Sequence, residues 1–314
     1  MQKTLNKSTH PSLNLNIGID LMGSDTTPFA ILHSALNLSN TLSPSIKLHL
    51  FGTEEIFLSA PLTQNVHFVT AYEVITMEDD PLIAIRHKKK ASMRLGIEQV
   101  KEKKLDAFIS FGNTGALMAS SKLSLSMLPG IVRPALLALM PNKGKDLAVL
   151  DVGANSSFKA EHLSQFALMG IAFQKSRGIT HPKVGLLNIG AESRKGTPLL
   201  REVYQQLEGL NQRTCGTFVG NIEGRGALAK DIDVLVTDGF TGNVFLKTAE
   251  GIASVVFEQL QNTNLDECSP EVKAHLTALC HNLDIAEYPP SPPEACIEDK
   301  GEKPIVLIYC EPLS

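Results

Sequence analysis

Short apolar runs alternate along this chain with segments in which apolar residues recur at helical spacing. That spacing predicts helices at Phe29–Leu38 and Pro81–Lys104, and Pro81 suits the first position of a helix. Such an alternation predicts an α/β fold with a mostly parallel sheet covered by helices. The predicted strands are Leu15–Asp20, Lys47–Leu50, Val66–Val69, Ala107–Phe111, Ala135–Met140, Leu147–Leu150, Val184–Ile189, Thr217–Val219 and Val234–Thr237.

Five of these apolar runs end in a segment that joins glycine to an amide or an acid. Glycine lets the backbone approach a ligand closely, and Asn or Asp tolerates tight turns. Because the carboxyl ends of parallel strands meet at one edge of a sheet, these segments predict a ligand site built from backbone N–H groups and helix starts. The segments are Ile19–Asp25, Ser110–Met118, Leu150–Asn155, Leu186–Pro198 and Thr237–Thr248.

The composition is that of a globular enzyme. The chain has 314 residues, of which 43% are hydrophobic, and a net charge of −4, which argues against nucleic acid as the main partner. The five cysteines form no CxxC pair, so we expect reduced thiols and a cytoplasmic protein. No apolar run reaches the roughly 18 residues of a membrane span, and we expect no secretory signal in Met1–Asn16.

Several common catalytic motifs are absent from the sequence. It has no GxSxG, no HExxH and no GxGxxG after a strand. The segment Gly190–Thr197 (GAESRKGT) differs from a P-loop, because its lysine precedes the glycine. The sequence therefore signals no zinc site, no P-loop and no dinucleotide fingerprint. Phosphate-binding loops without a nucleophilic side chain suit a reaction in which the substrate brings its own nucleophile and the protein orients it.

The five segments, together with Phe218–Gly226 (FVGNIEGRG) and Arg133–Leu136 (RPAL), resemble the phosphate acyltransferase family of bacterial phospholipid synthesis (PlsX). The resemblance runs from about Leu15 to Glu250. It implies a Rossmann-like αβα sandwich related to phosphate acetyltransferases and isopropylmalate-type dehydrogenases. It also implies direct transfer of a fatty acyl group from acyl carrier protein to inorganic phosphate, without a covalent enzyme intermediate. The resemblance further implies a homodimer that acts at the inner membrane surface without a metal or nucleotide cofactor and supplies a glycerol-3-phosphate acyltransferase.

The resemblance assigns catalysis to Lys195 and Asn243. A lysine can pair as a mobile point charge with phosphate or with the oxyanion, and an asparagine amide can donate to the same oxygen. Each residue also has a structural interpretation. Lys195 could be a solvated surface charge, and Asn243 could cap a helix that begins at Val244.

A second set of residues is predicted to bind substrate or to shape the loops. Asn113 and Thr114, with the amides near Gly115, would hold phosphate at a helix start. The carboxylates repel phosphate and suit loop orientation better, and turn stabilisation is the alternative for Asn155 and Asn188. The full set is Asp20, Gly23, Asp25, Asn113, Thr114, Gly115, Asp151, Asn155, Asn188, Glu192, Asn221, Glu223, Asp238 and Gly242.

One segment is basic although the whole chain is acidic. Pro81–Lys104 carries eight basic and two acidic residues, a charge of +6, so a total of −4 leaves −10 for the rest of the chain. Acyl carrier proteins are strongly acidic, and a basic helix face would steer their encounter. A solvated helix face is the alternative. The predicted docking residues are Arg86, Lys88, Lys89, Lys90 and Arg94.

The ends of the chain depart from the family pattern. We expect a disordered extension over residues 1–14, one domain over 15–288 with a helical region at 251–283 for dimer or membrane contact, and an atypical tail over 289–314. Pro289–Pro293 holds four prolines where the family has a glycine-rich turn. A frame change near Tyr288, which resequencing of the gene would test, is one hypothesis. The open alternatives are a coenzyme A-dependent enzyme and an inactive membrane-associated homologue.

Overall fold

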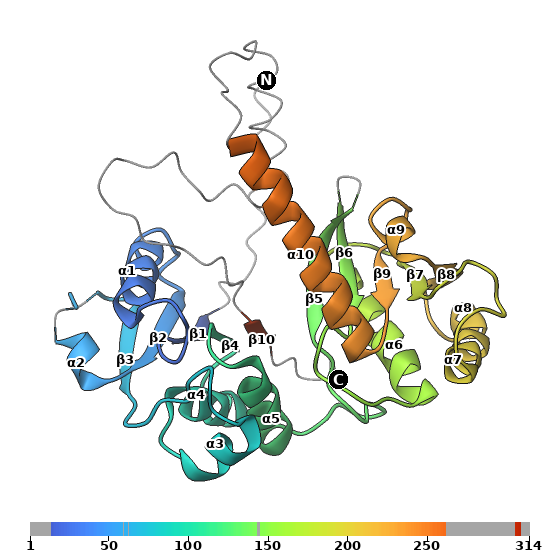
Figure 1. Cartoon of the computed structure of the whole chain (residues 1–314). Helices are drawn as coiled ribbons and strands as arrows, with labels where there is room; N and C mark the ends of the chain where they lie inside the picture. The colour runs from blue at the N-terminus through green and yellow to red at the C-terminus, as the bar shows by residue number, and fades with distance from the viewer. Residues whose placement is uncertain (1–13, 59, 62, 143–144, 262–304, 309–314) are drawn as a thin grey trace, which may run out of the picture. The chain divides into compact units, whose positions relative to one another are not determined.

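The computed structural model describes residues 14–58, 60–61, 63–142, 145–261 and 305–308. The chain divides into two compact units. Unit 1 runs to Leu128 and also takes in residues 305–308, and unit 2 begins at Pro129 (Figure 1). Residues 1–13 of the predicted extension, residues 262–283 of the predicted helical region and most of the atypical tail lie outside the described residues. The predicted domain limits, 15 and 288, stay predictions.

Unit 1 is a five-stranded sheet between two layers of helices. Its strand order is β10-β4-β1-β2-β3, parallel except for β10, with Ile17 of β1 opposite both Leu48 and Ala107. The helices α1 and α2 cover the face that carries Ile19 and Leu48, and α3, α4 and α5 cover the face that carries Phe108. The elements are β1 Leu15–Asp20, α1 Pro28–Ser39, β2 Ile46–Gly52, α2 Glu54–Phe57, β3 Val66–Thr70, α3 Pro81–His87, α4 Ser92–Lys101, β4 Ala107–Ser110, α5 Thr114–Ser124 and β10 Ile305–Ile308.

The predicted single helix over Pro81–Lys104 is wrong, because the chain leaves the helical path between α3 and α4. The α3 helix starts as expected, with Pro81 in its first turn and the Asp80 carboxylate accepting from the Ile83 N–H at 2.9 Å. It ends where the backbone after His87 turns to meet Glu73, which accepts the Lys90 N–H at 2.6 Å. Tertiary hydrogen bonds thus override the local helical pattern.

Unit 2 repeats this architecture, with strand order β5-β6-β9-β7-β8 and all neighbours parallel except β5. Val236 of β9 lies opposite both Leu150 and Leu186. Phe166 and Val203 cover one face with α6 and α7, while Phe245 and Leu246 bring α10 onto the other. The elements are β5 Leu137–Asn142, β6 Lys145–Leu150, α6 Ala160–Ser176, β7 Lys183–Leu187, α7 Pro198–Glu208, α8 Leu210–Arg213, β8 Thr217–Ile222, α9 Gly224–Ala227, β9 Val234–Val236 and α10 Gly239–Gln261.

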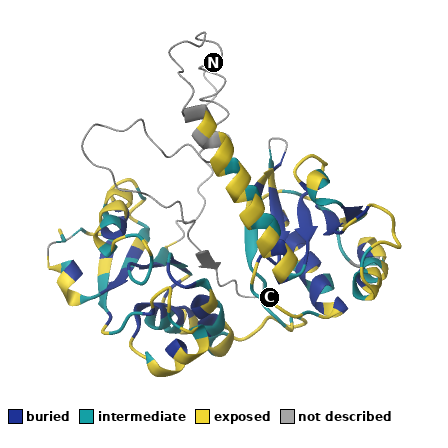
Figure 2. Ribbon diagram, in the orientation of Figure 1, coloured by how far each residue is buried: buried dark blue, intermediate teal, exposed yellow. Residues whose placement is uncertain are grey.

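The α/β class and the parallel pairing are therefore as predicted, and each of the nine predicted strands overlaps an observed one. In Figure 2 the inner strands β6, β9 and β7 of unit 2 are mostly buried, whereas α10 is exposed along most of its length. The first turns of α10 pack closely against the sheet. Gly239 and Gly242 lie against the loop after β6, where a methyl group on Gly242 would stand 1.9 Å from the Asp151 carbonyl oxygen.

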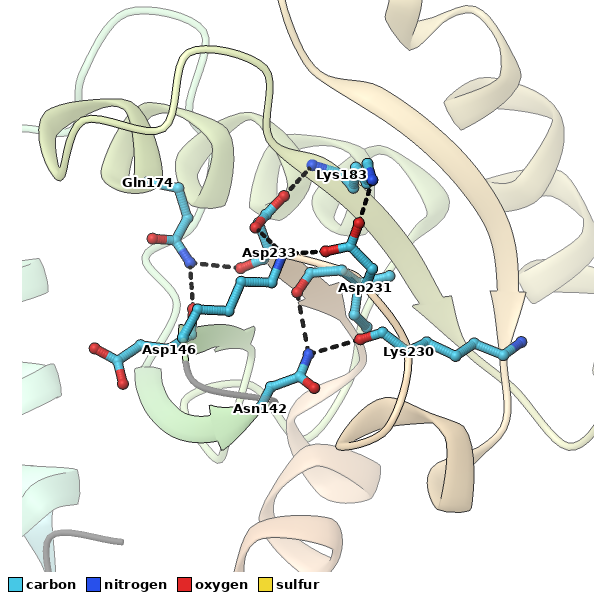
Figure 3. Close-up of polar contacts among 9 residues, drawn as sticks. Asn142, Asp146, Gln174, Lys183, Lys230, Asp231 and Asp233 are labelled. Carbon is cyan, nitrogen blue, oxygen red and sulfur yellow. Dashed lines mark hydrogen bonds and ion pairs between the residues drawn. The ribbon is translucent and has the colours of Figure 1, made fainter. Parts of the chain in front are cut away.

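A polar cluster ties the amino ends of β6, β7 and β9 together (Figure 3). The buried Asp233 carboxylate accepts from Lys145 Nζ at 2.7 Å and from the Lys183 N–H at 2.7 Å. Its backbone carbonyl accepts from Gln174 Nε2 at 2.6 Å. Asp231 pairs with both lysines but is largely exposed, and these lysines lower the pKa of its carboxyl to about 2.

The Asp233→Ala variant tests how much this cluster contributes to the free energy of unfolding. Removing the buried carboxylate leaves the Lys183 N–H without its acceptor and leaves Lys145 paired with Asp231 alone, so we expect the free energy of unfolding to fall by about 2 kcal/mol. The matched Asp231→Ala variant should stay close to wild type, because solvent screens its ion pairs. Urea unfolding followed by circular dichroism measures both. Equal losses in the two variants would contradict the assignment.

Two glycines of α10 offer a matched pair for the packing of its first turns. In Gly242→Ala the new methyl group collides with the Asp151 backbone, so we expect a loss of about 3 kcal/mol. Gly251 lies further along α10 and faces open space. The Gly251→Ala variant should therefore gain up to about 1 kcal/mol from helix propensity. Thermal unfolding compares the two, and a neutral Gly242→Ala would show that α10 does not rest on that loop.

Candidate active site

The predicted site residues lie at the carboxyl ends of parallel strands in both units. In unit 2 they follow four adjacent strands, in the order β6, β9, β7 and β8. Asp151 follows β6, Asp238 follows β9, Asn188 follows β7 and Glu223 follows β8. Since parallel strands end at the same edge, this edge of unit 2 gathers most of the candidate residues.

In unit 1 the buried Asp20 carboxylate organises the first loops. It accepts from the Met22 N–H at 3.1 Å and from Ser110 Oγ at 2.9 Å, and Ser110 in turn accepts from the Gly112 N–H at 3.1 Å. Burial raises the pKa of Asp20 to about 6, against the lowering effect of its hydrogen bonds. Asp20 thus joins the loop after β1 to the loop after β4.

Asn113 caps α5 rather than pointing into open space. Its Oδ1 accepts from the Ala116 N–H at 3.0 Å, and its Nδ2 lies 3.2–3.3 Å from the carbonyl oxygens of Thr76, Met77 and Asp79. The amide therefore fixes the start of α5 against the loop before α3. Thr114 and Gly115 form the first turn of this helix.

The two remaining candidates in unit 1 differ in burial and role. Gly23 has φ +76°, and a methyl group there would stand 2.1 Å from the Ile75 carbonyl oxygen, so this turn requires glycine. Asp25 is exposed.

The fully buried Asp151 is the hub of the loop after β6. Its Oδ1 accepts from the N–H groups of Leu136, Gly153 and Ala154 at 2.9–3.1 Å. Its Oδ2 accepts from the N–H and Nδ2 of Asn155 at 2.9 and 2.8 Å. The loop amides therefore bind this internal carboxylate, which agrees with loop orientation rather than with direct contact to a phosphate.

Asn243 lies inside α10, so the alternative that it caps a helix beginning at Val244 is wrong. The helix begins at Gly239. The Asp238 carboxylate performs the capping, since its Oδ1 accepts from the Thr241 N–H at 2.9 Å. Asn243 is exposed, and its side chain lies beside Gly153, where an added methyl group would stand 3.7 Å away. Its amide is thus free of a capping role.

Lys195 is exposed in the loop between β7 and α7, and its aliphatic stem runs close to Gly190. Asn188 and Asn221 lie buried at the base of this loop, and Glu192 lies exposed within it. Glu223 pairs with Arg225 at 3.0 Å. Lys195 and Asn243 follow β7 and β9, which are adjacent strands.

The five predicted docking residues of unit 1 fall into two groups. Lys88 turns inward, to Asp79 at 2.6 Å and to the Val74 carbonyl oxygen at 2.8 Å. Arg94 likewise donates to the Ile85 carbonyl oxygen at 2.7 Å and pairs with Glu98. The other three residues are exposed: Arg86, Lys89 and Lys90.

Sequence patterns missed the role of Ser110 as a partner of Asp20 and the cluster around Asp233. Ser110 stands directly before the FGNTG segment, so its position was the one available signal. Among the described residues, no group of three or more His, Cys, Asp or Glu could hold a metal ion. No described helix is long and apolar enough to cross a membrane.

The fold has known counterparts among solved structures. A phosphotransacetylase from Streptococcus pyogenes matches with a TM-score of 0.57 at 17% identity, covering 77% of this chain and 82% of that one. The EutD phosphotransacetylase from Staphylococcus aureus matches with a TM-score of 0.56 at 16% identity, covering 77% and 83%. At such identities the likeness shows the fold.

Sequence comparison goes further. The phosphate acyltransferase of Oceanobacillus iheyensis is 41% identical over 283 residues, which are 87% of this chain and 83% of that protein. The phosphate acyltransferase of Chlamydia pneumoniae is 40% identical over 291 residues, 89% and 86% of the two chains. A family model described as fatty acid synthesis protein matches residues 15–288. The resemblance found in the sequence is confirmed, and the chain belongs to the fatty acid synthesis protein family.

Proposed function

We propose that the protein is an acyltransferase that moves a fatty acyl group from acyl carrier protein to inorganic phosphate, forming acyl phosphate. One observation carries the proposal. An exposed lysine and an exposed amide, Lys195 and Asn243, follow adjacent parallel strands in a family whose relatives are named phosphate acyltransferases. Phosphate and an acyl donor are the substrates that such a name requires.

The proposed step is direct attack by phosphate on the thioester. A phosphate oxygen forms a bond to the carbonyl carbon, and the tetrahedral intermediate then breaks its C–S bond and releases the pantetheine thiolate. Lys195 offers a mobile positive charge to the phosphate or to the oxyanion, and the Asn243 amide donates to the oxyanion. Neither group becomes acylated. The backbone N–H groups of the loop after β6 already bind the Asp151 carboxylate, and Gly153 of this loop lies beside the Asn243 side chain.

The exposed basic residues of unit 1 favour a carrier protein over coenzyme A as the donor. Within the described residues neither Arg86 nor Lys89 forms an ion pair, and Lys90 Nζ lies 5.5 Å from the ring centre of the exposed Tyr72. An acidic protein could contact all three without breaking an internal bond. The side chains of Lys88 and Arg94 are engaged in hydrogen bonds within unit 1. We therefore assign docking to the three exposed residues, Arg86, Lys89 and Lys90.

The exposed side chains of α10 support the predicted homodimer and membrane contact. Ile252, Val255 and Val256 are each more than half exposed on this helix. An exposed apolar surface of this kind supports a homodimer contact or peripheral binding at the inner membrane surface. The acyl phosphate would there be available to a glycerol-3-phosphate acyltransferase.

The first test incubates the protein with palmitoyl-acyl carrier protein and labelled phosphate. We expect phosphate-dependent acyl phosphate, and a fall in kcat of about 10²- to 10³-fold in Lys195→Ala and in Asn243→Ala, because each removes a donor to the developing charge. Lys175→Ala, an exposed lysine of α6, is the control and should keep wild-type activity. A folded wild-type protein that makes no acyl phosphate would refute the proposal.

Docking is tested with the Arg86→Glu, Lys89→Glu double variant. We expect its KM for acyl-acyl carrier protein to rise about tenfold, because charge reversal repels an acidic partner. Its turnover of an acyl-pantetheine thioester, which lacks the protein, should not change. Lys101→Glu, an exposed lysine at the end of α4, serves as the matched control. Equal losses of activity with both acyl donors would show that Arg86 and Lys89 do not take part in recognition of the carrier protein.

A further inference from the structure

The loop that presents Lys195 rests on a pair of buried amides. Asn188 directly follows β7, and Asn221 lies near the end of the neighbouring strand β8. They are only 8% and 3% exposed. By contrast, residues 191–195 above them are all exposed. The loop therefore has an open tip on a polar, solvent-excluded base.

The two amides bind each other and the backbone of the loop. Asn188 Nδ2 donates to Asn221 Oδ1 and to the Lys195 carbonyl oxygen, both at 3.1 Å. Asn221 Nδ2 donates to the Glu192 carbonyl oxygen at 2.7 Å. Between these two anchor points, the Lys195 N–H donates to the Glu192 carbonyl oxygen at 3.0 Å. The turn that carries Lys195 is thus held at both of its ends.

These bonds leave little capacity for a ligand. Both hydrogens of Asn188 Nδ2 are used, and its Oδ1 accepts from the Ile189 N–H at 2.8 Å. Asn221 uses its oxygen and one hydrogen inside the same network. Buried amides in this state stabilise their neighbours and do not reach a substrate on the open side of the loop.

The backbone after Lys195 fits closely over the pair. Gly196 has φ +86°, and a methyl group there would stand 2.5 Å from Asn188 Oδ1. Only glycine lets the chain close onto the amide in this conformation. Immediately afterwards Thr197 caps α7, accepting from the Leu200 N–H at 3.2 Å, and Pro198 occupies its first turn. The exit of the loop is therefore fixed as well.

We propose that Asn188 and Asn221 are positioning residues, which hold the Lys195 turn in one conformation and do not bind phosphate or the acyl donor. Their effect on catalysis rests on the function proposed above for Lys195. Their effect on the order of the loop does not, because it follows from the hydrogen bonds alone.

The test uses Asn221→Asp, which keeps the size of the side chain but replaces the donor to the Glu192 carbonyl with an acceptor. We expect kcat to fall about 10- to 100-fold with an unchanged KM for phosphate, because displacement of a catalytic group by about 1 Å has such an effect. Hydrogen exchange at the Lys195 amide should accelerate about tenfold, since its turn loosens. Asn221→Ala, which introduces no charge, is the second variant if the first does not fold.

Asn142→Asp is the matched control. Asn142 is 2% exposed and its Nδ2 donates to the carbonyl oxygens of Lys230 and Ile232 at the opposite edge of the same sheet. This variant should lower thermal stability while leaving kcat and exchange at Lys195 as in wild type.

The outcomes separate the two proposals. A raised KM for phosphate at constant kcat would make Asn221 a substrate ligand and overturn the inference, as would unchanged exchange at Lys195 in both Asn221 variants. If wild-type protein forms no acyl phosphate, the proposed function fails. In that case, faster hydrogen exchange at the Lys195 amide in the Asn221 variants than in wild type would still support the role of the two amides in ordering the loop.

Discussion

The buried carboxylate of Asp151 is the interaction on which the candidate site depends. A charged group without solvent needs hydrogen-bond donors, and the chain supplies five from Leu136, Gly153, Ala154 and Asn155. These five hydrogen bonds to Asp151 hold the loop after β6 in one conformation. The glycines at the start of α10 then pack onto its backbone, so the position of Asn243 follows from the solvation of a single acid.

Unit 1 also contains a buried carboxylate, that of Asp20, but its hydrogen bonds differ. Asp20 is the last residue of the central strand β1, it has fewer donors than Asp151, and burial raises its pKa to about 6. Its partner Ser110 comes from the adjacent strand, so the contact joins two loops instead of closing one. In both units an acid at the carboxyl edge shapes the loops, and in unit 2 the side chains of Lys195 and Asn243 remain exposed.

Local sequence patterns predicted the strands and the class of fold because apolar runs and glycine-containing ends depend on neighbours in the chain. They failed at Lys88–Ala91, where hydrogen bonds to Tyr72 and Glu73 interrupt an otherwise helical pattern. They also gave the wrong helix start in the capping alternative for Asn243, since a helix start at Gly239 depends on Asp238 and on close packing with the Asp151 loop. The bonds between Asn188 and Asn221 join residues 33 positions apart. Contacts over such separations have no local signature.

The internal bonding of these loops has a thermodynamic consequence. Each loop at the carboxyl edge of unit 2 is held by groups of the chain itself, so its shape exists before any substrate arrives. The entropy lost in ordering it is therefore part of the free energy of folding and not of the free energy of binding. Substitutions at Asp151, Asn188 or Gly196 will consequently change how long the folded protein persists in the cell as well as how fast it turns over.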